Sequence, residues 1–151
     1  MEIGDTLPAG TLTAADGTPF ALADLAGQPL VLYFYPKADT TGCTREAQDF
    51  SALAEQFRAR GAAVIGVSRD TPAKLLRFAE KHALSVELAS DEDGSVCEAF
   101  GVWVEKQMYG RSYMGIERAT FLFDAGGTLV SQWRKVKVAG HAAAVLSALP
   151  S

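Results

Sequence analysis

The chain has 151 residues, of which 48% are hydrophobic, and a formal net charge of -4 at pH 7. A chain of this size suits one globular domain over residues 1–151, which can bury roughly 70% of its unfolded surface without disulfides or a metal. The negative charge argues against nucleic acids and anionic membranes as partners. The N-terminus lacks the basic start and apolar core of a signal peptide, and no apolar run is long enough to span a membrane. We therefore expect a cytoplasmic protein.

The first part of the chain is predicted to contain a hairpin and then a buried strand. Residues 11–13 and 18–22 alternate around a turn at residues 16–17, Asp-Gly, which is typical of a β-hairpin. Residues 30–35 form an unbroken apolar, β-branched and aromatic run, as expected for a strand covered on both faces. Pro36 ends this strand because proline has no N–H group to donate to a neighbouring strand.

A helix follows, and it carries one of the two cysteines near its start. Apolar residues recur at helical spacing from Gly42 to Phe57, so Cys43 is expected in the first turn. Unpaired backbone N–H groups and the positive end of the helix dipole favour a thiolate at that place, which lowers the pKa of a thiol. The polar residues 37–42 indicate access to solvent. We expect Cys43 to be a nucleophile; the alternative is a buried, inert cysteine.

The rest of the chain mixes strands with helices and contains one segment without a clear pattern. The expected order is strand, helix, strand, short helix, strand, strand and helix, over residues 63–68, 71–83, 86–89, 91–100, 119–123, 128–133 and 142–149. The short helix carries Cys97. Residues 102–115 have no clear period, and we predict an irregular loop there.

The stretch around Cys43 resembles a known active site. Pro36, Thr40 and Cys43 fit the PxxxTxxC motif of the peroxiredoxins, and YFYPKADTTGCT resembles the bacterioferritin-comigratory, or peroxiredoxin Q, subfamily. The resemblance covers nearly the whole chain and includes GVSRD at 66–70, SDEDGSVCEAFGVW at 90–103 and GIERATFLFD at 115–124. It implies an α/β, thioredoxin-like fold with a central mixed sheet flanked by helices and an N-terminal β-hairpin extension, and the predicted order of elements agrees.

The resemblance also implies an activity and its residues. Cys43 would be the peroxidatic cysteine, which reduces hydrogen peroxide and organic hydroperoxides through a sulfenic acid, and Arg118 would be the active-site arginine. The Thr40 hydroxyl can accept the peroxide proton and donate to an oxygen. Pro36 can shield the thiol and shape the loop, or it can simply end the strand. Glu46 could orient an arginine or favour the helix start. No cofactor or metal is required.

Recycling is where the chain departs from the family. Gln48 and Ala79 occupy the two positions at which relatives carry a resolving cysteine, and Thr41 replaces the usual proline before Gly-Cys. Cys97 is the only other thiol, on a helix face predicted to point inward. We expect a one-cysteine peroxidase, monomeric or weakly dimeric, that is reduced by an external thiol. The alternative is a Cys43–Cys97 disulfide opened by thioredoxin, which would require local unfolding.

Two other classes of protein use a reactive cysteine. A cysteine hydrolase needs a histidine base beside the nucleophile, and neither His82 nor His141 lies in a motif that indicates one. A redox sensor or holdase chaperone without turnover also uses an accessible, reactive cysteine. Repeated turnover of peroxide distinguishes a peroxidase from both.

Overall fold

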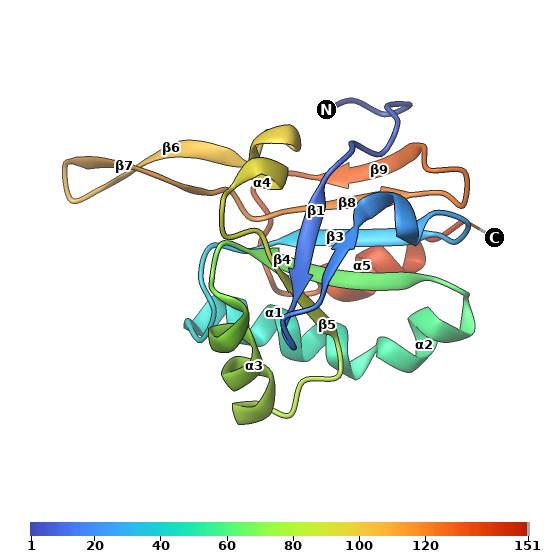
Figure 1. Cartoon of the computed structure of the whole chain (residues 1–151), viewed down its shortest axis with the longest axis horizontal. Helices are drawn as coiled ribbons and strands as arrows, with labels where there is room; N and C mark the ends of the chain where they lie inside the picture. The colour runs from blue at the N-terminus through green and yellow to red at the C-terminus, as the bar shows by residue number, and fades with distance from the viewer. Residues whose placement is uncertain (151) are drawn as a thin grey trace.

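A seven-stranded mixed sheet forms the centre of the computed structural model, which describes residues 1–150 (Figure 1). The strand order is β2-β1-β5-β4-β3-β8-β9, and β6 and β7 form a separate two-stranded hairpin. The strands are β1 (Thr11–Ala14), β2 (Pro19–Ala21), β3 (Leu30–Phe34), β4 (Ala63–Ser68), β5 (Glu87–Ser90), β6 (Trp103–Met108), β7 (Arg111–Ile116), β8 (Ala119–Phe123) and β9 (Leu129–Trp133). The helices are the 3-10 helix η1 (Leu22–Leu25) and the α-helices α1 (Thr41–Ala52), α2 (Ala54–Ala59), α3 (Pro72–Lys81), α4 (Ser95–Ala99) and α5 (His141–Ser147).

Strand β3 is the middle of this sheet, as its apolar sequence predicts. All five of its residues are buried, and it pairs with β4 in parallel and with β8 antiparallel. Because neighbouring side chains of a strand point to opposite faces, β3 contributes to two separate cores. Leu30, Leu32 and Phe34 join one core, while Val31 and Tyr33 join the other.

The two cores are covered by different helices. The core on the face of Phe34 contains α4 residues, among them Cys97, and we name it the α4 core. The core on the face of Tyr33 contains Cys43 and Phe50 of α1 together with residues of α3 and α5, and we name it the α1 core. The two cysteines therefore lie on opposite faces of the central sheet.

The predicted N-terminal hairpin is present and extends the main sheet. Strands β1 and β2 pair antiparallel, with Leu12 opposite Phe20. Strand β1 also pairs with β5, where Ala14 lies opposite Ala89. The hairpin thus adds two strands to one edge of the sheet.

The prediction of an irregular loop over residues 102–115 is wrong, because this segment forms the β6–β7 hairpin. It projects from the body of the molecule (Figure 1). Its turn consists of Tyr109 and Gly110, which both have positive φ, at 53° and 76°, as a two-residue hairpin turn of this kind requires. Most residues of the hairpin are exposed or half-buried. Without a buried face, its sequence has no apolar alternation to detect.

The helix predicted from Gly42 to Phe57 is divided in two. Helix α1 ends at Ala52 and α2 begins at Ala54, and Leu53 between them has φ -101° and ψ 5°. The apolar spacing continues across this break, which is why the sequence predicts one helix. None of the helices in residues 1–150 combines the length and the hydrophobicity needed to cross a membrane.

Gly66 gives the first testable prediction, because it makes room for Tyr33 on the neighbouring strand. A Cβ atom at Gly66 would lie 2.5 Å from Cζ and Oη of Tyr33. The Tyr33 ring cannot easily retreat, since it is fully buried and stacks on Phe50 with ring centroids 4.5 Å apart. We expect Gly66→Ala to lower the free energy of unfolding by about 1–3 kcal/mol, the usual cost of overpacking a core.

Urea denaturation of the purified variant measures this loss. Gly126→Ala is the matched control, because a Cβ there meets only ordinary contact, at 3.4 Å from Asp124 Oδ1. An unfolding midpoint of Gly66→Ala equal to that of the wild type would contradict the steric explanation.

Candidate active site

Cys43 lies at the N-terminal end of α1, as predicted. Thr40 is the N-cap, and the Thr44 N–H group donates to the Thr40 carbonyl at 2.9 Å, which starts the helical hydrogen bonding. Cys43 is the third residue of the helix, next to backbone N–H groups that have no helical partner. The expected access to solvent is absent in this conformation, because only 2% of Cys43 is exposed.

Arg118 is the group that contacts the Cys43 thiol. It lies in the link between β7 and β8, where it is brought to the start of α1 by the pairing of β8 with β3. Its Nη2 donates to Cys43 Sγ at 3.3 Å, and its Nη1 donates to Glu46 Oε1 at 2.6 Å. Gly42 leaves space for this contact, since a Cβ there would lie 3.2 Å from Arg118 Nη2.

Glu46 orients the arginine, the first of the two roles considered for it. One helical turn after Cys43, its side chain is buried, and Oε2 has no hydrogen-bond partner within residues 1–150. Burial raises the pKa of Glu46 to about 7, although Arg118 acts in the opposite direction. Burial also disfavours the charged form of Arg118, but Glu46 and Cys43 raise the pKa of Arg118 above its ordinary value. The guanidinium therefore remains a cation beside the thiol.

The loop between β3 and α1 is held in place by Asp70, a residue that sequence reasoning did not select. The Ala38 N–H group donates to Asp70 Oδ2 at 2.8 Å, and the Ser68 hydroxyl donates to the same oxygen at 2.7 Å. Lys74 forms an ion pair with Oδ1 at 3.3 Å. This anchor holds Ala38, which is buried in the α1 core together with Cys43.

Pro36 and Thr40 lie at the two ends of this loop and face the same cavity. The Thr40 hydroxyl donates to the Lys37 carbonyl at 2.8 Å. A hydroxyl that donates once still has lone pairs that can accept a hydrogen bond. Pro36 lies two residues after the end of β3 and borders the cavity.

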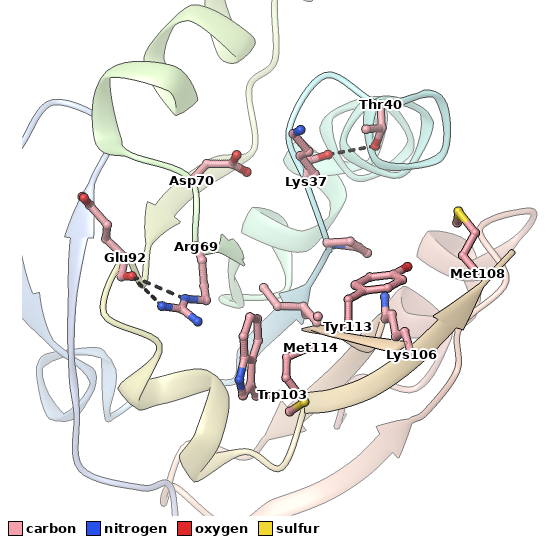
Figure 2. A pocket seen from close by; sticks show the side chains of 13 residues that line it. Lys37, Thr40, Arg69, Asp70, Glu92, Trp103, Lys106, Met108, Tyr113 and Met114 are labelled. Atoms are coloured by element: carbon pink, nitrogen blue, oxygen red, sulfur yellow. Dashed lines mark hydrogen bonds between the residues drawn. The ribbon is translucent and has the colours of Figure 1, made fainter. Parts of the chain in front are cut away.

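Figure 2 shows this cavity, which we name the hairpin pocket. It lies between the β3–α1 loop, the end of β4 and the β6–β7 hairpin, and it has a volume of about 710 Å³. Its lining residues are Pro36, Lys37, Thr40, Arg69, Asp70, Glu92, Trp103, Lys106, Met108, Tyr113, Met114, Gly115 and Ile116. The hairpin contributes most of the apolar wall, so this part of the site was missed together with the hairpin itself.

Cys97 is remote from these groups. It is fully buried in the α4 core, and its backbone N–H donates to Asp91 Oδ2 at 2.7 Å. Burial, and then the neighbouring Asp91, raise the pKa of Cys97 far above its ordinary value. Cys97 is thus held as a neutral thiol, which is a poor nucleophile.

Neither histidine is placed to act as a base for Cys43. His141 Nε2 is hydrogen-bonded to the Thr120 hydroxyl at 2.7 Å, and burial lowers the pKa of His141 to about 4. His82 Nε2 lies 2.8 Å from Asp39 Oδ1 on the surface. Within residues 1–150, no group of three or more His, Cys, Asp or Glu side chains could hold a metal ion.

Comparison with known families identifies the class of protein. The model of the AhpC/TSA family matches residues 3–132, which is most of the chain. The chain belongs to this family, the peroxiredoxins, and is a thiol-dependent peroxidase.

Individual relatives identify the branch of the family. Peroxiredoxin Bcp of Xanthomonas campestris is 50% identical over 147 residues, covering 95% of this chain and 92% of the relative. Peroxiredoxin Bcp of Bacillus subtilis is 46% identical over 149 residues, covering 99% and 95%. The solved structure of Xylella fastidiosa PrxQ has a TM-score of 0.92 and 43% identity, covering 97% of this chain and 94% of that one. The predicted resemblance to the bacterioferritin-comigratory, or peroxiredoxin Q, subfamily and the thioredoxin-like fold are confirmed.

Proposed function

We propose that Cys43 is the peroxidatic cysteine and that Arg118 activates it. The observation that carries this assignment is the 3.3 Å contact from Arg118 Nη2 to Cys43 Sγ at the start of α1. A cation at this distance interacts favourably with negative charge on the sulfur, and the start of α1 adds the positive end of a helix dipole. Glu46 supports the assignment because it fixes the guanidinium from the other side.

The chemistry follows from these positions. The Cys43 thiolate attacks one peroxide oxygen, the O–O bond breaks, and the departing oxygen takes a proton to leave as water or an alcohol. Cys43 becomes a sulfenic acid. Arg118 donates to the oxygen on which negative charge develops, and Thr40 can accept the hydrogen bond of the peroxide while it donates to Lys37. Pro36 and Thr40 shape the side of the loop that faces the hairpin pocket.

We further propose a one-cysteine cycle. Cys43 lies in the α1 core and Cys97 in the α4 core, so the whole sheet separates them, and a disulfide needs Cα atoms within about 7 Å. An external thiol would displace the sulfenic oxygen as water and form a mixed disulfide with Cys43. A second thiol would then release the Cys43 thiol and an external disulfide.

Cys97→Ser tests the recycling step. We expect the variant to keep wild-type peroxide turnover with a small-thiol reductant, because no step of the cycle uses Cys97. Intact mass after one equivalent of hydrogen peroxide should show the wild-type protein as sulfenic acid or mixed disulfide. Excess peroxide should convert Cys43 to sulfinic acid, since no internal thiol competes for it.

The two-cysteine alternative makes the opposite prediction. The oxidised wild type would lose two mass units, Cys97→Ser would not, and thioredoxin-dependent turnover would disappear in the variant. That result would require α1 or α4 to open in every cycle, because both cysteines are buried in the closed fold.

Turnover tests the peroxidase assignment against the sensor or chaperone. We expect the protein to consume many equivalents of hydrogen peroxide, or of an organic hydroperoxide, when a thiol is supplied. The X. campestris bacterioferritin comigratory protein, whose alkyl peroxide reduction activity has been studied structurally, has a TM-score of 0.88 and 46% identity over 95% of this chain and 96% of that one. This supports organic hydroperoxides as substrates here. Consumption that stops after one equivalent would favour the sensor.

We propose that residues 1–151 act as one domain, monomeric or weakly dimeric, and that thioredoxin or another thiol reduces it. A reducing compartment such as the cytoplasm suits this cycle, because Cys43 must return to the free thiol. The main sheet is continuous from β2 at one edge to β9 at the other, which supports a single domain.

A further inference from the structure

The hairpin pocket is much larger than hydrogen peroxide, and its unpaired charges are positive. Asp70 is one of its two acidic residues, and its carboxylate is already occupied by Lys74, Ser68 and the Ala38 N–H group. Glu92 is the other. Figure 2 shows its carboxylate pointing away from the pocket, while its backbone carbonyl accepts from Arg69. Neither acid therefore offers a free negative charge to a ligand in the pocket.

The three basic residues of the pocket, in contrast, are available to an anion. Lys37, Arg69 and Lys106 form no ion pair with any acidic residue in the described part of the chain. Arg69 uses Nε and Nη2 on a neutral carbonyl and lies over the Trp103 ring at 4.4 Å. Burial, followed by the charge of Arg118, lowers the pKa of Lys106, so Lys106 lies within the electrostatic reach of Arg118. An anion bound here would meet a positive field although the chain is acidic overall.

The arrangement of these charges indicates which kind of ligand would fit the pocket. Figure 2 shows Arg69 beside Trp103 in one part of the pocket and Lys106 beside Tyr113 in another, with Met114 between them. A small molecule with an anionic group at each end and a less polar middle would match both cations. The pocket is also bounded by Pro36 and Thr40, the two ends of the loop between β3 and α1. A molecule bound there borders the loop that leads to Cys43.

We propose that the hairpin pocket binds the recycling reductant, a low-molecular-weight thiol that carries two carboxylates. Lys106 and Arg69 hold the two carboxylates, and the thiol between them is presented to the loop that leads to Cys43. The bound thiol gives up its proton, forms the S–S bond with oxidised Cys43 and releases the sulfenic oxygen as water; a second thiol completes the reduction. This inference rests on the proposed one-cysteine cycle, in which the reductant must come from outside.

Binding without chemistry is the first test. S-methylglutathione has both carboxylates of glutathione but no free thiol, so calorimetry with the reduced protein measures recognition alone. We expect saturable binding that weakens with added salt and weakens about threefold in Lys106→Gln, the factor expected for one partly exposed ion pair. Lys137→Gln, the same substitution on an exposed surface outside the pocket, should bind as the wild type does.

Kinetics are the second test. Protein oxidised with one equivalent of hydrogen peroxide is mixed with glutathione or with glutathione diethyl ester, which has the same skeleton without the negative charges. The rate of sulfenic acid loss should be several times faster with the acid than with the ester, and Lys106→Gln should reduce this ratio about threefold. The ratio is taken within each variant, so a change in folding or in the peroxide step cancels.

Several results would overturn the proposal. These are the absence of saturable S-methylglutathione binding, equal binding in Lys106→Gln and wild type, or equal rates with the acid and the ester. A pocket variant that slows only the reaction with a carboxylated organic hydroperoxide would assign the pocket to the peroxide instead. Failure to form any sulfenic acid would refute the proposed function, and the binding experiment would still decide the ligand of the pocket.

Discussion

A purified Cys43→Ser protein is expected to lose peroxide consumption completely while it keeps its fold. A serine hydroxyl is far too weakly acidic to ionise at neutral pH, so neither Arg118 nor the start of α1 can convert it into a strong nucleophile. The exchange of sulfur for oxygen is small, and Cys43 contributes little to the α1 core compared with Phe50 or Tyr33. Peroxide consumption with a thiol reductant measures the loss, and thermal unfolding checks the fold.

Cys97→Ser is the matched control for this experiment, because it makes the same chemical exchange at the other buried cysteine. The expected contrast is no turnover in Cys43→Ser and full turnover in Cys97→Ser. If Cys43→Ser kept most of its activity, Cys43 would not be the peroxidatic residue, and the assignment of the site would fail.

Arg118→Ala is expected to slow the attack on peroxide at least tenfold. The variant loses two charge-assisted donors, one to Cys43 Sγ and one to Glu46 Oε1. One well-placed donor to a developing negative charge is typically worth about 3 kcal/mol, or roughly a hundredfold in rate. The second-order rate constant for sulfenic acid formation with hydrogen peroxide, measured by rapid mixing, reports this step alone.

Arg118→Lys separates the charge from the geometry. Lysine retains a cation, but it presents one compact ammonium group and cannot donate to Cys43 and Glu46 through a planar fork. We expect a rate between those of Arg118→Ala and the wild type. Glu46→Gln gives a further comparison, since it retains an acceptor for Nη1 without the carboxylate. An unchanged rate in Arg118→Ala would show that the arginine is only structural.

The centre of the fold and the position of Cys43 could be predicted from local sequence. The apolar run of β3 predicts a strand that is buried on both faces. The change to helical spacing after Gly42 places Cys43 at the start of a helix. These signals lie within a few residues of one another. Local patterns are sufficient where the structure is decided by periodicity and burial.

The rest of the site depends on contacts between distant residues. Nothing near Arg118 in the sequence distinguishes it from a surface arginine, and only the resemblance to peroxiredoxins selected it. Asp70 acts on Ala38, 32 positions away in the chain. Cys43 is buried in the α1 core, so the polar loop sequence wrongly predicted an exposed thiol. Pairing of β8 with β3, which brings Arg118 to Cys43, cannot be derived from either segment alone.

The β6–β7 hairpin could not be predicted from the sequence for a different reason. Its strands pair only with each other within residues 1–150, and its turn places Tyr109, 97% exposed, in a backbone region that tyrosine rarely adopts. A strand without a buried face needs no alternation of apolar residues. The sequence of residues 103–116 is therefore consistent with a loop, and backbone pairing decides the structure.

This separate pairing has a consequence for motion in the enzyme. A two-stranded ribbon outside the main sheet is only marginally stable by itself, so it can open locally at a small fraction of the free energy needed to unfold the molecule. Cys43 and Arg118, in contrast, are attached to β3 and β8 at the centre of the sheet. The wall that carries Lys106 and Tyr113 can thus swing to admit and release molecules of different sizes, while the reacting atoms stay fixed on the rigid part of the protein.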